Sequence, residues 1–581
     1  MPSDAFNIAQ FLPAMAASAP DRPAVICEHA PDALGRTTLS FKELNADSDG
    51  LAWGLSRNGL KAGQRTLVLV RPGLDFISLT FALFKLGAVP VLIDPGMGKK
   101  NLLACIKQVR PEAFIGISLG HALRVLKGGD AFSEVKLNVT VGRRWFWGGK
   151  TLAQIRESGA STEPFPLAPT TNDSPAAILF TTGSTGIPKG VCYKHGMFGA
   201  QVTAIRAQYG IEPGEIDLPA FPLFALFSTA LGTTCVIPDM DPTRPAQCDP
   251  EIIVRAIQQH KVTYTFGSPS IWKRVGPYCL EKNITLPTLK RILMAGAPVR
   301  GEVLAPFAKI LGPDADTHIP YGATESLPVC SIRGSEVLRE TWDLTRAGKG
   351  HCVGRPLPGN TVRIIRPDES QIADCGLPND PVDVWNDSRV LPAGKIGEIV
   401  VKGDVVTHEY FEMPEQTQKA KIYERRGQDV AVWHRMGDMG YFDEKGRLWF
   451  CGRKAHRVIM EDGKVLYSVC VEAVFEEAFQ SHKYGTRLRG IRCALVGIGM
   501  PSAQRACIIA ELPYSYVYDL KDPSDIFSEN SFTNWWQRHP LALHVTNILS
   551  YPNLFPVDIR HNAKINREEL ARWAEKELAK R

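Results

Sequence analysis

The stretch Thr181-Thr182-Gly183-Ser184-Thr185-Gly186-Ile187-Pro188-Lys189-Gly190 combines three glycines, four hydroxyl side chains and one lysine. Two short apolar runs, 176–180 and 191–193, flank it and predict buried strands. Glycine lets successive backbone N–H groups converge on an anion, while the hydroxyls add donors and Lys189 adds a positive charge. The stretch therefore predicts a phosphate-binding loop, and the flanking strands disfavour the alternative of a flexible surface loop. It differs from the pattern G-x-x-x-x-G-K-[ST], because Pro188 stands in place of the second glycine.

Strands and helices alternate on both sides of this loop. Residues 66–70 are typical of a buried strand, a helical pattern follows to about residue 86, and 89–93 predict the next strand. The same alternation recurs over 102–115 and 252–266, and 291–294 predict a further strand. These βαβ units predict an α/β fold with parallel sheets flanked by helices.

Length and composition set the broad class. With 581 residues, of which 44% are hydrophobic and 22% charged, we expect a globular protein with one large domain and at least one more. A net charge of +6 without a concentrated basic run argues against nucleic-acid binding. We see no secretory signal and no apolar run of the roughly 18 residues that a membrane span needs. Thirteen cysteines without a C-x-x-C pair predict reduced thiols and a cytoplasmic protein, with neither a zinc site nor a disulfide framework.

Two segments look inserted. Residues 367–393 are rich in Asp, Pro, Asn and Ser and predict a long surface loop. Residues 512–539 contain Trp535 and Trp536, for which we expect packing in a core, with a protein contact as the alternative.

Two further motifs suit a nucleotide. In Tyr321-Gly322-Ala323-Thr324-Glu325, a tyrosine at a strand end can stack on adenine, and a carboxylate four residues later can hold a magnesium ion that bridges phosphates. In the segment 435–441, Asp438 lies between two glycines, where its carboxylate can accept hydrogen bonds from both ribose hydroxyls. Taken alone, the first motif could be an ordinary strand-to-turn segment, and the second could be an ordinary aspartate in a turn.

The order of these motifs resembles the adenylate-forming superfamily, which contains acyl-CoA synthetases, luciferases and peptide-synthetase adenylation domains. The stretch 181–190 is similar to its phosphate loop, 321–325 to its Y-G-x-T-E motif and 437–438 to its G-D pair. Gly452-Arg453 matches its hinge sequence, and Lys564-Ile565-Asn566-Arg567 matches its C-terminal K-I-x-R, although His561, Asn562 and Ala563 replace the usual residues before it. With the βαβ pattern, the resemblance covers essentially the whole chain.

The resemblance implies an enzyme that uses ATP and Mg²⁺ to join a carboxylate to AMP. It implies catalytic roles for Lys564, Glu325 and Thr182, with Glu325 also the magnesium contact; the positive charge of Lys564 would offset the charge that grows at the α-phosphate. It further implies a set of ATP- or AMP-binding residues, namely Thr181, Thr182, Gly183, Ser184, Thr185, Gly186, Lys189, Gly296, Ala297, Pro298, Tyr321, Gly322, Ala323, Thr324, Asp438 and Arg453.

The implied architecture has two parts. A large N-terminal adenylation domain, 1–452, would hold the ATP and acyl sites on parallel and mixed sheets flanked by helices. A small mobile α+β C-terminal domain, 453–581, would carry Lys564 and swing about a hinge near Arg453.

Departures from the superfamily pattern narrow the resemblance. Ala455 stands where an Asp or Lys is usual, Gly463 lies one residue late, and Ser468 and Cys470 interrupt the P-x-E-I-E pattern, of which Glu472 is kept. With the ending F-P-V-D-I-R-H-N-A-K-I at 555–565, these departures resemble the olefin β-lactone synthetases of bacterial long-chain hydrocarbon biosynthesis. That family adenylates a 2-alkyl-3-hydroxy fatty acid, whose own 3-hydroxyl then displaces AMP to close a β-lactone. A complex with other enzymes of hydrocarbon biosynthesis is implied.

The stretch Phe221-Pro222-Leu223-Phe224-Ala225-Leu226-Phe227 matches the position of the family's aromatic motif beside the acyl pocket. Its lack of charge suits an alkyl chain, so we expect Phe224 first, with Phe221 and Phe227, to line that pocket. A plain buried strand is the alternative.

Three other functions remain open from the sequence. A long-chain fatty-acyl-CoA synthetase or a fatty-acyl-AMP ligase would pass the acyl group to a thiol. A catalytically silent, ATP-binding regulatory subunit is disfavoured because Lys189, Glu325, Asp438 and Lys564 are all present. A nucleic-acid-joining enzyme is disfavoured by the even charge distribution.

Overall fold

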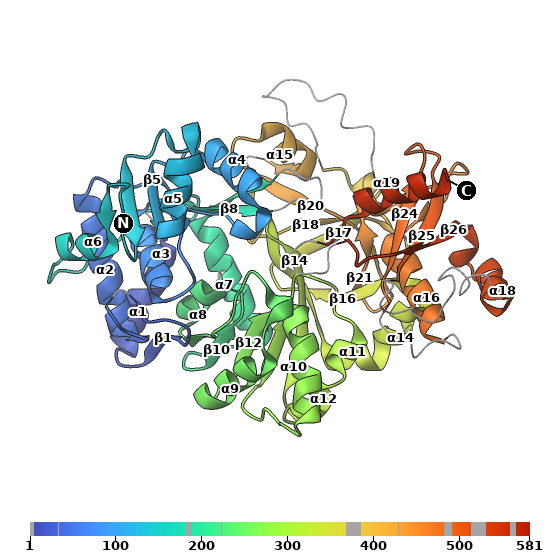
Figure 1. Cartoon of the computed structure of the whole chain (residues 1–581), viewed down its shortest axis with the longest axis horizontal. Coiled ribbons are helices and arrows are strands. Elements are labelled where there is room, and N and C mark those ends of the chain that lie inside the picture. The colour runs from blue at the N-terminus through green and yellow to red at the C-terminus, as the bar shows by residue number, and fades with distance from the viewer. Residues whose placement is uncertain are drawn as a thin grey trace.

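The computed structural model describes residues 5–32, 34–181, 188–221, 224–367, 385–427, 429–481, 491–512, 530–557 and 565–580. Within these ranges two large sheets form the body of the protein, and a small three-stranded sheet lies at one end with the C-terminal helices (Figure 1). None of the described helices has the length and apolar run that crossing a bilayer needs.

The predicted phosphate loop connects the last two strands of a seven-stranded sheet. Its strands, in spatial order, are β7 (Lys150–Thr151), β6 (Leu137–Val141), β5 (Ala113–Ile117), β3 (Arg65–Leu69), β4 (Val89–Leu92), β8 (Pro175–Thr181) and β9 (Lys189–Lys194). All neighbours are parallel except β8 and β9. The crossovers include α3 (Leu74–Leu86), α4 (Lys99–Val109), α5 (Ser118–Lys127) and α6 (Leu152–Ser158). The predicted βαβ pattern is therefore confirmed here, because strands paired in parallel need such long connections.

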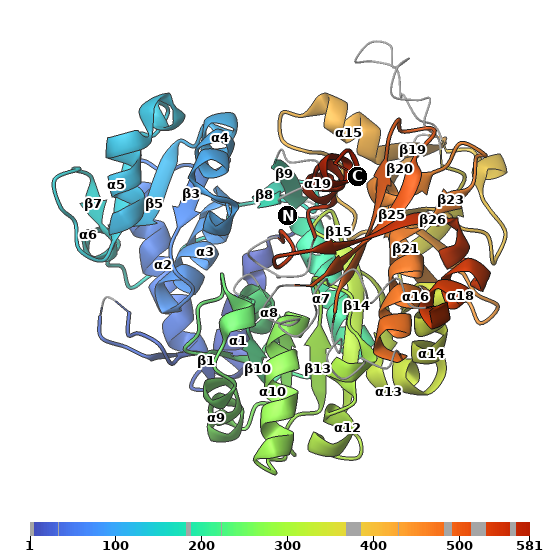
Figure 2. The same ribbon diagram turned by 45° about the vertical axis from the view of Figure 1, so that its right-hand side comes forward.

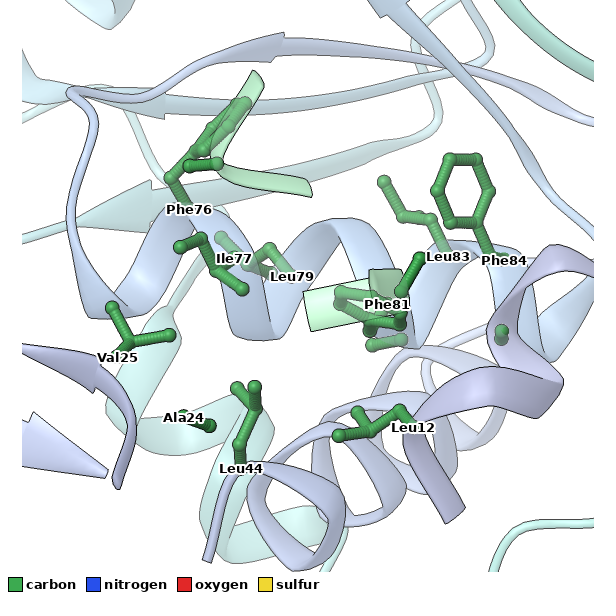
Figure 3. Packing of buried hydrophobic residues seen from close by; sticks show 14 of the residues in the cluster. Leu12, Ala24, Val25, Leu44, Phe76, Ile77, Leu79, Phe81, Leu83 and Phe84 are labelled. Atoms are coloured by element: carbon green, nitrogen blue, oxygen red, sulfur yellow. The ribbon is translucent and has the colours of Figure 1, made fainter. Parts of the chain in front are cut away.

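Helix α3 is the centre of the largest hydrophobic core. Twelve of its thirteen residues are buried, and Gly87 ends it in the left-handed conformation at φ 74°. Figure 3 shows its phenylalanine, leucine and isoleucine side chains in one cluster with Leu12 of α1 (Phe11–Ser18), Leu44 of α2 (Phe41–Arg57) and Val25 of β1 (Pro23–Cys27). Burying each such side chain contributes about 1.5–3 kcal/mol. Lys85 is tolerated there because its ammonium lies 2.7 Å from Asp49 and also donates to Asn45.

A second, fourteen-stranded sheet is mixed. Its parallel part runs through β1, β11 (Thr234–Ile237), β10 (Ile216–Pro219), β12 (Tyr264–Gly267), β13 (Arg291–Met294) and β14 (Asp316–Ala323). Antiparallel strands continue it through β15 (Ser326–Arg333), β16 (His351–Pro356), β21 (Leu448–Arg453), β20 (Asp429–Phe442), β18 (Gly397–Lys402) and β17 (Thr361–Ile365). The strands β2 (Thr38–Ser40) and β19 (Lys421–Arg426) complete it.

Helices cover both faces of this sheet. On one face α7 (His195–Tyr209) and α8 (Ala225–Leu231) join the core around α3, and on the other α9 (Pro250–His260) and α10 (Pro269–Glu281) build a separate core. Parallel strands end together at their carboxyl ends, so the residues after β12, β13 and β14 lie along one edge of the sheet, where α/β proteins place their ligands.

The chain after Arg453 forms its own sheets. The short strands β22 (Val458–Ile459) and β23 (Val465–Leu466) pair, and β24 (Cys493–Ile498), β25 (Arg505–Glu511) and β26 (Val545–Tyr551) make the three-stranded sheet. Helices α16 (Ser468–Ser481), α18 (Asn530–Arg538) and α19 (Arg567–Leu578) pack on it (Figure 2). Trp535 and Trp536 pack against this core, with the Trp535 ring 5.4 Å from that of Phe475, which confirms the core-packing prediction.

Two ion pairs join α16 to the body of the protein. Arg300 contacts Glu476 at 2.7 Å, and Arg346 contacts Glu477 at 3.0 Å. The last strand of the large sheet ends at Arg453, but the domain boundary at 452/453 stays a prediction. Most of the predicted surface loop 367–393 lies outside the described residues, and so do residues 513–529 of the second insertion.

Candidate active site

The phosphate-loop stretch begins and ends on paired strands. Thr181 and Lys189 are register partners at the ends of β8 and β9, while Thr182, Gly183, Ser184, Thr185 and Gly186 lie outside the described residues. Lys189 is half-buried, and its ammonium lies 4.9 Å from the centroid of the Tyr410 ring. Burial lowers the pKa of Lys189, while the nearby carboxylate of Glu325 acts in the opposite direction. The lysine and the carboxylate of two separate motifs are therefore neighbours.

Glu325 lies in the turn between β14 and β15 and is held by the segment 406–411. The Tyr410 hydroxyl donates to Glu325 Oε1 at 2.7 Å, and the Thr407 N–H donates to the Glu325 carbonyl at 2.9 Å. The same segment reaches β9, because Phe411 N–H donates to Gly190 O at 2.7 Å. Burial, followed by the charge of Glu325, raises the pKa of Tyr410 far above neutral pH, so its hydroxyl stays protonated and remains a donor. One short segment thus ties the phosphate-loop strand to the Glu325 turn.

Tyr321, Asp438 and Arg453 form one hydrogen-bonded group. The Tyr321 hydroxyl donates to Asp438 Oδ2 at 2.6 Å, and Arg453 Nη1 donates to Asp438 Oδ1 at 2.8 Å and to Met436 O at 3.0 Å. Asp438 and Arg453 are register partners on β20 and β21. The charge of Asp438 is the main cause that raises the pKa of Arg453. This network fixes the direction of the carboxylate and of the tyrosine ring.

Of the predicted ATP- and magnesium-binding residues that the structure describes, all but Lys189 line one large cavity of about 2890 Å³. Those that line it are Thr181, Gly296, Ala297, Pro298, Tyr321, Gly322, Ala323, Thr324, Glu325, Asp438 and Arg453. Gly296 follows β13 with φ 94°, a left-handed conformation that favours glycine. Lys564 lies outside the described residues, but Val557 and Ile565, on either side of residues 558–564, also line this cavity.

The C-terminal K-I-x-R motif is anchored near the cavity by an ion pair. Arg567 Nη2 donates to both carboxylate oxygens of Glu472 at 2.8 Å, and the Leu495 N–H donates to Glu472 Oε1 at 2.7 Å. Glu472 is the residue kept from the otherwise altered P-x-E-I-E pattern. The two motifs thus meet in space, and the bidentate pair holds the start of α19.

The aromatic segment builds an apolar wall, but not as a strand. Helix α8 begins at Ala225 with Phe224 as its capping residue, so the alternative of a plain buried strand is wrong. The Phe224 ring stacks on Phe266 at 3.7 Å and lies 5.7 Å from Phe221 and 5.6 Å from Phe227. All four rings line the cavity. Apolar content alone does not distinguish a short helix from a buried strand, which is why the sequence allowed a strand where the structure has α8.

Asp217 on β10 is a buried carboxyl group beside this wall that no motif indicated. It lines the cavity and accepts a hydrogen bond from Ser228 Oγ at 2.6 Å. Burial raises the pKa of Asp217 to about 8, so the side chain is mostly neutral at pH 7. The wall therefore keeps the uncharged character that an alkyl chain requires.

Two other residues near the site belong to no sequence motif. The Tyr410 hydroxyl donates to Glu325, which is 85 residues away in the chain, and no motif at 406–411 predicted this contact. Lys421 is fully buried behind the same segment, where its ammonium contacts Thr407 O and lies 3.2 Å from His434 Nδ1. Such contacts depend on chain segments that only folding brings together.

The cavity wall suits a magnesium ion that arrives with a nucleotide. No cluster of three or more His, Cys, Asp or Glu side chains able to hold a metal occurs in the described part of the chain. Magnesium commonly binds one or two carboxylates together with substrate phosphates and keeps several waters. Glu325, a single carboxylate at the cavity wall near Lys189, fits that mode of binding.

Comparisons with known proteins agree with this geometry. Residues 12–411 match the AMP-binding enzyme family. The olefin β-lactone synthetase of Stenotrophomonas maltophilia is 45% identical over 585 residues, which cover 99% of each chain. The olefin β-lactone synthetase of Xanthomonas campestris pv. campestris is 44% identical, over 98% of this chain and 97% of that protein.

A solved structure shares the fold at low identity. The O-succinylbenzoate coenzyme A synthetase MenE of Bacillus subtilis, in complex with ATP and magnesium ion, superimposes with a TM-score of 0.70 at 19% identity. The match covers 96% of this chain and 98% of that one. At this identity the likeness concerns the fold alone.

Proposed function

Because this chain belongs to the AMP-binding enzyme family, in which a carboxylate is activated with ATP, we propose that it converts a 2-alkyl-3-hydroxy fatty acid into a β-lactone in olefin biosynthesis. The observation that carries the proposal is the identity of 45% to an olefin β-lactone synthetase over 99% of both chains. The uncharged aromatic wall around Phe224 and the neutral Asp217 support an alkyl substrate.

The first step forms an acyl-adenylate. A carboxylate oxygen of the fatty acid attacks the α-phosphorus of ATP, and the bond to the leaving pyrophosphate breaks. We assign Lys189 to the phosphates and Lys564 to the growing charge at the α-phosphate, since positive groups in a partly dry site stabilise such charge. Magnesium, when bound, would neutralise charge on the phosphates, and Glu325 is the residue we assign to hold it.

The nucleoside would lie against the Tyr321–Asp438–Arg453 group. The Asp438 carboxylate, oriented by its two donors, is assigned to the ribose hydroxyls. Because the Tyr321 hydroxyl is anchored to Asp438, the tyrosine ring is fixed at the cavity wall, where adenine can stack on it. Gly296, Ala297 and Pro298 are assigned to the adenine side of the same cavity.

The second step is intramolecular. The 3-hydroxyl oxygen attacks the acyl carbonyl carbon, the bond to AMP breaks, and the hydroxyl proton is released as the four-membered ring closes. A nucleophile within the same molecule has a large effective molarity, which helps against ring strain. The reaction needs no thiol acceptor.

The proposal includes two domains, 1–452 and 453–581, with a lid motion about the hinge. Arg453 donates to Met436 O and Asp438, and Lys454 contacts Glu398 at 3.0 Å, so both hinge residues are tied to the large sheet. Rotation about the following residues would carry the C-terminal part while this anchor stays in place.

Product analysis tests the function. The purified chain would receive ATP, magnesium and a 2-alkyl-3-hydroxy fatty acid, without CoA or a carrier protein, and the products would be identified by mass spectrometry and NMR. We expect a β-lactone, AMP and pyrophosphate. A matched 2-alkyl fatty acid that lacks the 3-hydroxyl should support pyrophosphate–ATP exchange but give no lactone. An acyl-adenylate of the hydroxy acid that persists until a thiol is added would contradict the proposal and favour an acyl-CoA or acyl-AMP ligase.

A further inference from the structure

Exposed hydrophobic side chains gather near helix α5. Of the twelve large hydrophobic residues that are exposed in the described ranges, five lie on α5 or on the loop between β6 and β7. These five residues, which we call the α5 patch, are Leu119, Val125, Leu126, Trp145 and Phe146. Their exposed fractions run from 45% for Val125 to 75% for Leu119. Scattered single apolar residues need no explanation, but such a concentration marks an interaction surface.

The loop is fastened along the helix, so the two parts of the patch form one surface. Ser118 Oγ donates to Arg143 O at 2.5 Å, and Arg124 Nη2 donates to Trp147 O at 3.1 Å. The buried Trp147 ring stacks on His121 of α5 with centroids 5.6 Å apart. Trp145 and Phe146 flank this anchored ring at 5.3 and 5.5 Å. The patch is thus held in place rather than carried on a loose tip.

Basic residues outnumber acidic ones on the segment that carries the patch. The segment 118–150 contains six basic and two acidic residues, whereas the net charge of all 581 residues is only +6. One of the two acids, Asp130, is paired with Lys107 at 2.6 Å. Helix α4 packs on the same core cluster as α5 and begins with two more exposed lysines. The exposed basic residues of the segment 118–150 are Lys127, Lys136, Arg143, Arg144 and Lys150, and the start of α4 adds Lys99 and Lys100.

The patch also borders the candidate active-site cavity. Leu119 and Leu126 are 75% and 72% exposed and yet line the cavity that contains the nucleotide and acyl residues. The cavity therefore reaches the surface beside α5. Figures 1 and 2 place α5 at the outer edge of the molecule, away from α16, α18 and α19.

We propose that the α5 patch docks this protein onto the surface of an anionic lipid bilayer. Leucine, tryptophan and phenylalanine side chains suit the boundary region of the acyl chains, and the basic residues beside them suit the negative headgroups. Trp, Phe and Arg would also suit a protein interface, but most of the exposed basic residues here are lysines, which are depleted from such interfaces and therefore favour the bilayer. Docking would bring the cavity opening next to a pool of dissolved lipid. That advantage rests on the proposed fatty-acid substrate, whereas the binding itself does not.

Vesicle sedimentation tests the docking without ATP or substrate. The full chain is mixed with sucrose-loaded vesicles of phosphatidylglycerol and phosphatidylethanolamine, or of phosphatidylcholine alone. We expect binding to the anionic vesicles, little to the neutral ones, and release at 0.5 M salt, where charges are screened. Each basic residue near such a surface contributes about 1 kcal/mol, so the double variant Arg143→Gln/Arg144→Gln should bind about 30-fold more weakly.

A second variant tests the contribution of the apolar side chains to vesicle binding separately from that of the basic residues. Trp145→Ser/Phe146→Ser should also lose vesicle binding, while Leu280→Ser, at a 42% exposed site on α10, should not. None of the four residues altered in these two variants lines the cavity, so pyrophosphate–ATP exchange with a short, soluble acid should be unchanged and serves as the test of folding.

Three results would overturn the docking. The first is equal binding to neutral and anionic vesicles, and the second is no binding to either. The third is that the variants bind vesicles as well as the wild type but lose self-association, seen as a lower mass in solution. Intact vesicle binding with no lactone formed would leave the docking standing and reject only the proposed reaction.

Discussion

The hydrogen bond from Tyr410 to Glu325 is predicted to set the affinity for magnesium. Tyr410 is 5% exposed and its hydroxyl is 2.7 Å from Glu325 Oε1, so Tyr410→Phe removes the donor with little change in packing. A hydrogen bond to a charged group contributes about 1.5–3 kcal/mol, and loss of a partner that orients a metal-binding carboxylate typically costs about 10- to 100-fold in metal affinity or activity. We therefore expect the magnesium concentration for half-maximal activity to rise about 10- to 100-fold.

The assay is pyrophosphate–ATP exchange measured against magnesium at saturating fatty acid. Tyr441→Phe is the matched control, because it removes a hydroxyl that donates to Lys349 O at 3.1 Å outside the candidate site. A positioning role also predicts that Tyr410→Phe adds little to the effect of Glu325→Gln, since the tyrosine acts through the carboxylate. A variant with a lower melting temperature but unchanged magnesium dependence would refute the reasoning and leave Tyr410 a structural residue.

Three other predictions concern the nucleotide, the lysine and pH. Asp438→Asn should raise the KM for ATP about 10- to 100-fold, measured by exchange, because the ribose contact loses its charge; Asp443→Asn on the same hairpin is the control. Lys564→Ala should lower adenylation about 100- to 1000-fold without changing the melting temperature, and an unchanged rate would remove that lysine from the mechanism. Burial lowers the pKa of Lys421 from 10.5 to about 7, so between these values the unfolded chain binds more protons and stability rises with pH. The free energy of unfolding of Lys421→Met, relative to wild type, should therefore fall from pH 7 to 10 in urea titrations, whereas that of the exposed Lys61→Met should not.

The sequence predicted the fold class and the family because both depend on local patterns. Alternating apolar runs at 66–93 determine strands and a helix from residues that are neighbours in the chain, and the structure has β3, α3 and β4 there. The order of the motifs from Thr181 to Arg567 identified the superfamily, and the family match agrees. The helix at 225–231 was not predicted, because the apolar run 221–227 that overlaps its start has no clear period.

Only the tertiary structure decided which side chains work together. Tyr321 and Asp438 are 117 residues apart, and their hydrogen bond exists because β14 and β20 belong to one sheet. Tyr410 reaches Glu325 from a segment without a motif. The basic and apolar residues around α5 come from two separate stretches, 119–127 and 143–146, which become one surface because Trp147 packs on the helix. Local sequence determines backbone preferences, whereas contacts between distant segments follow from burying the core, and the chemistry of the site depends on those contacts.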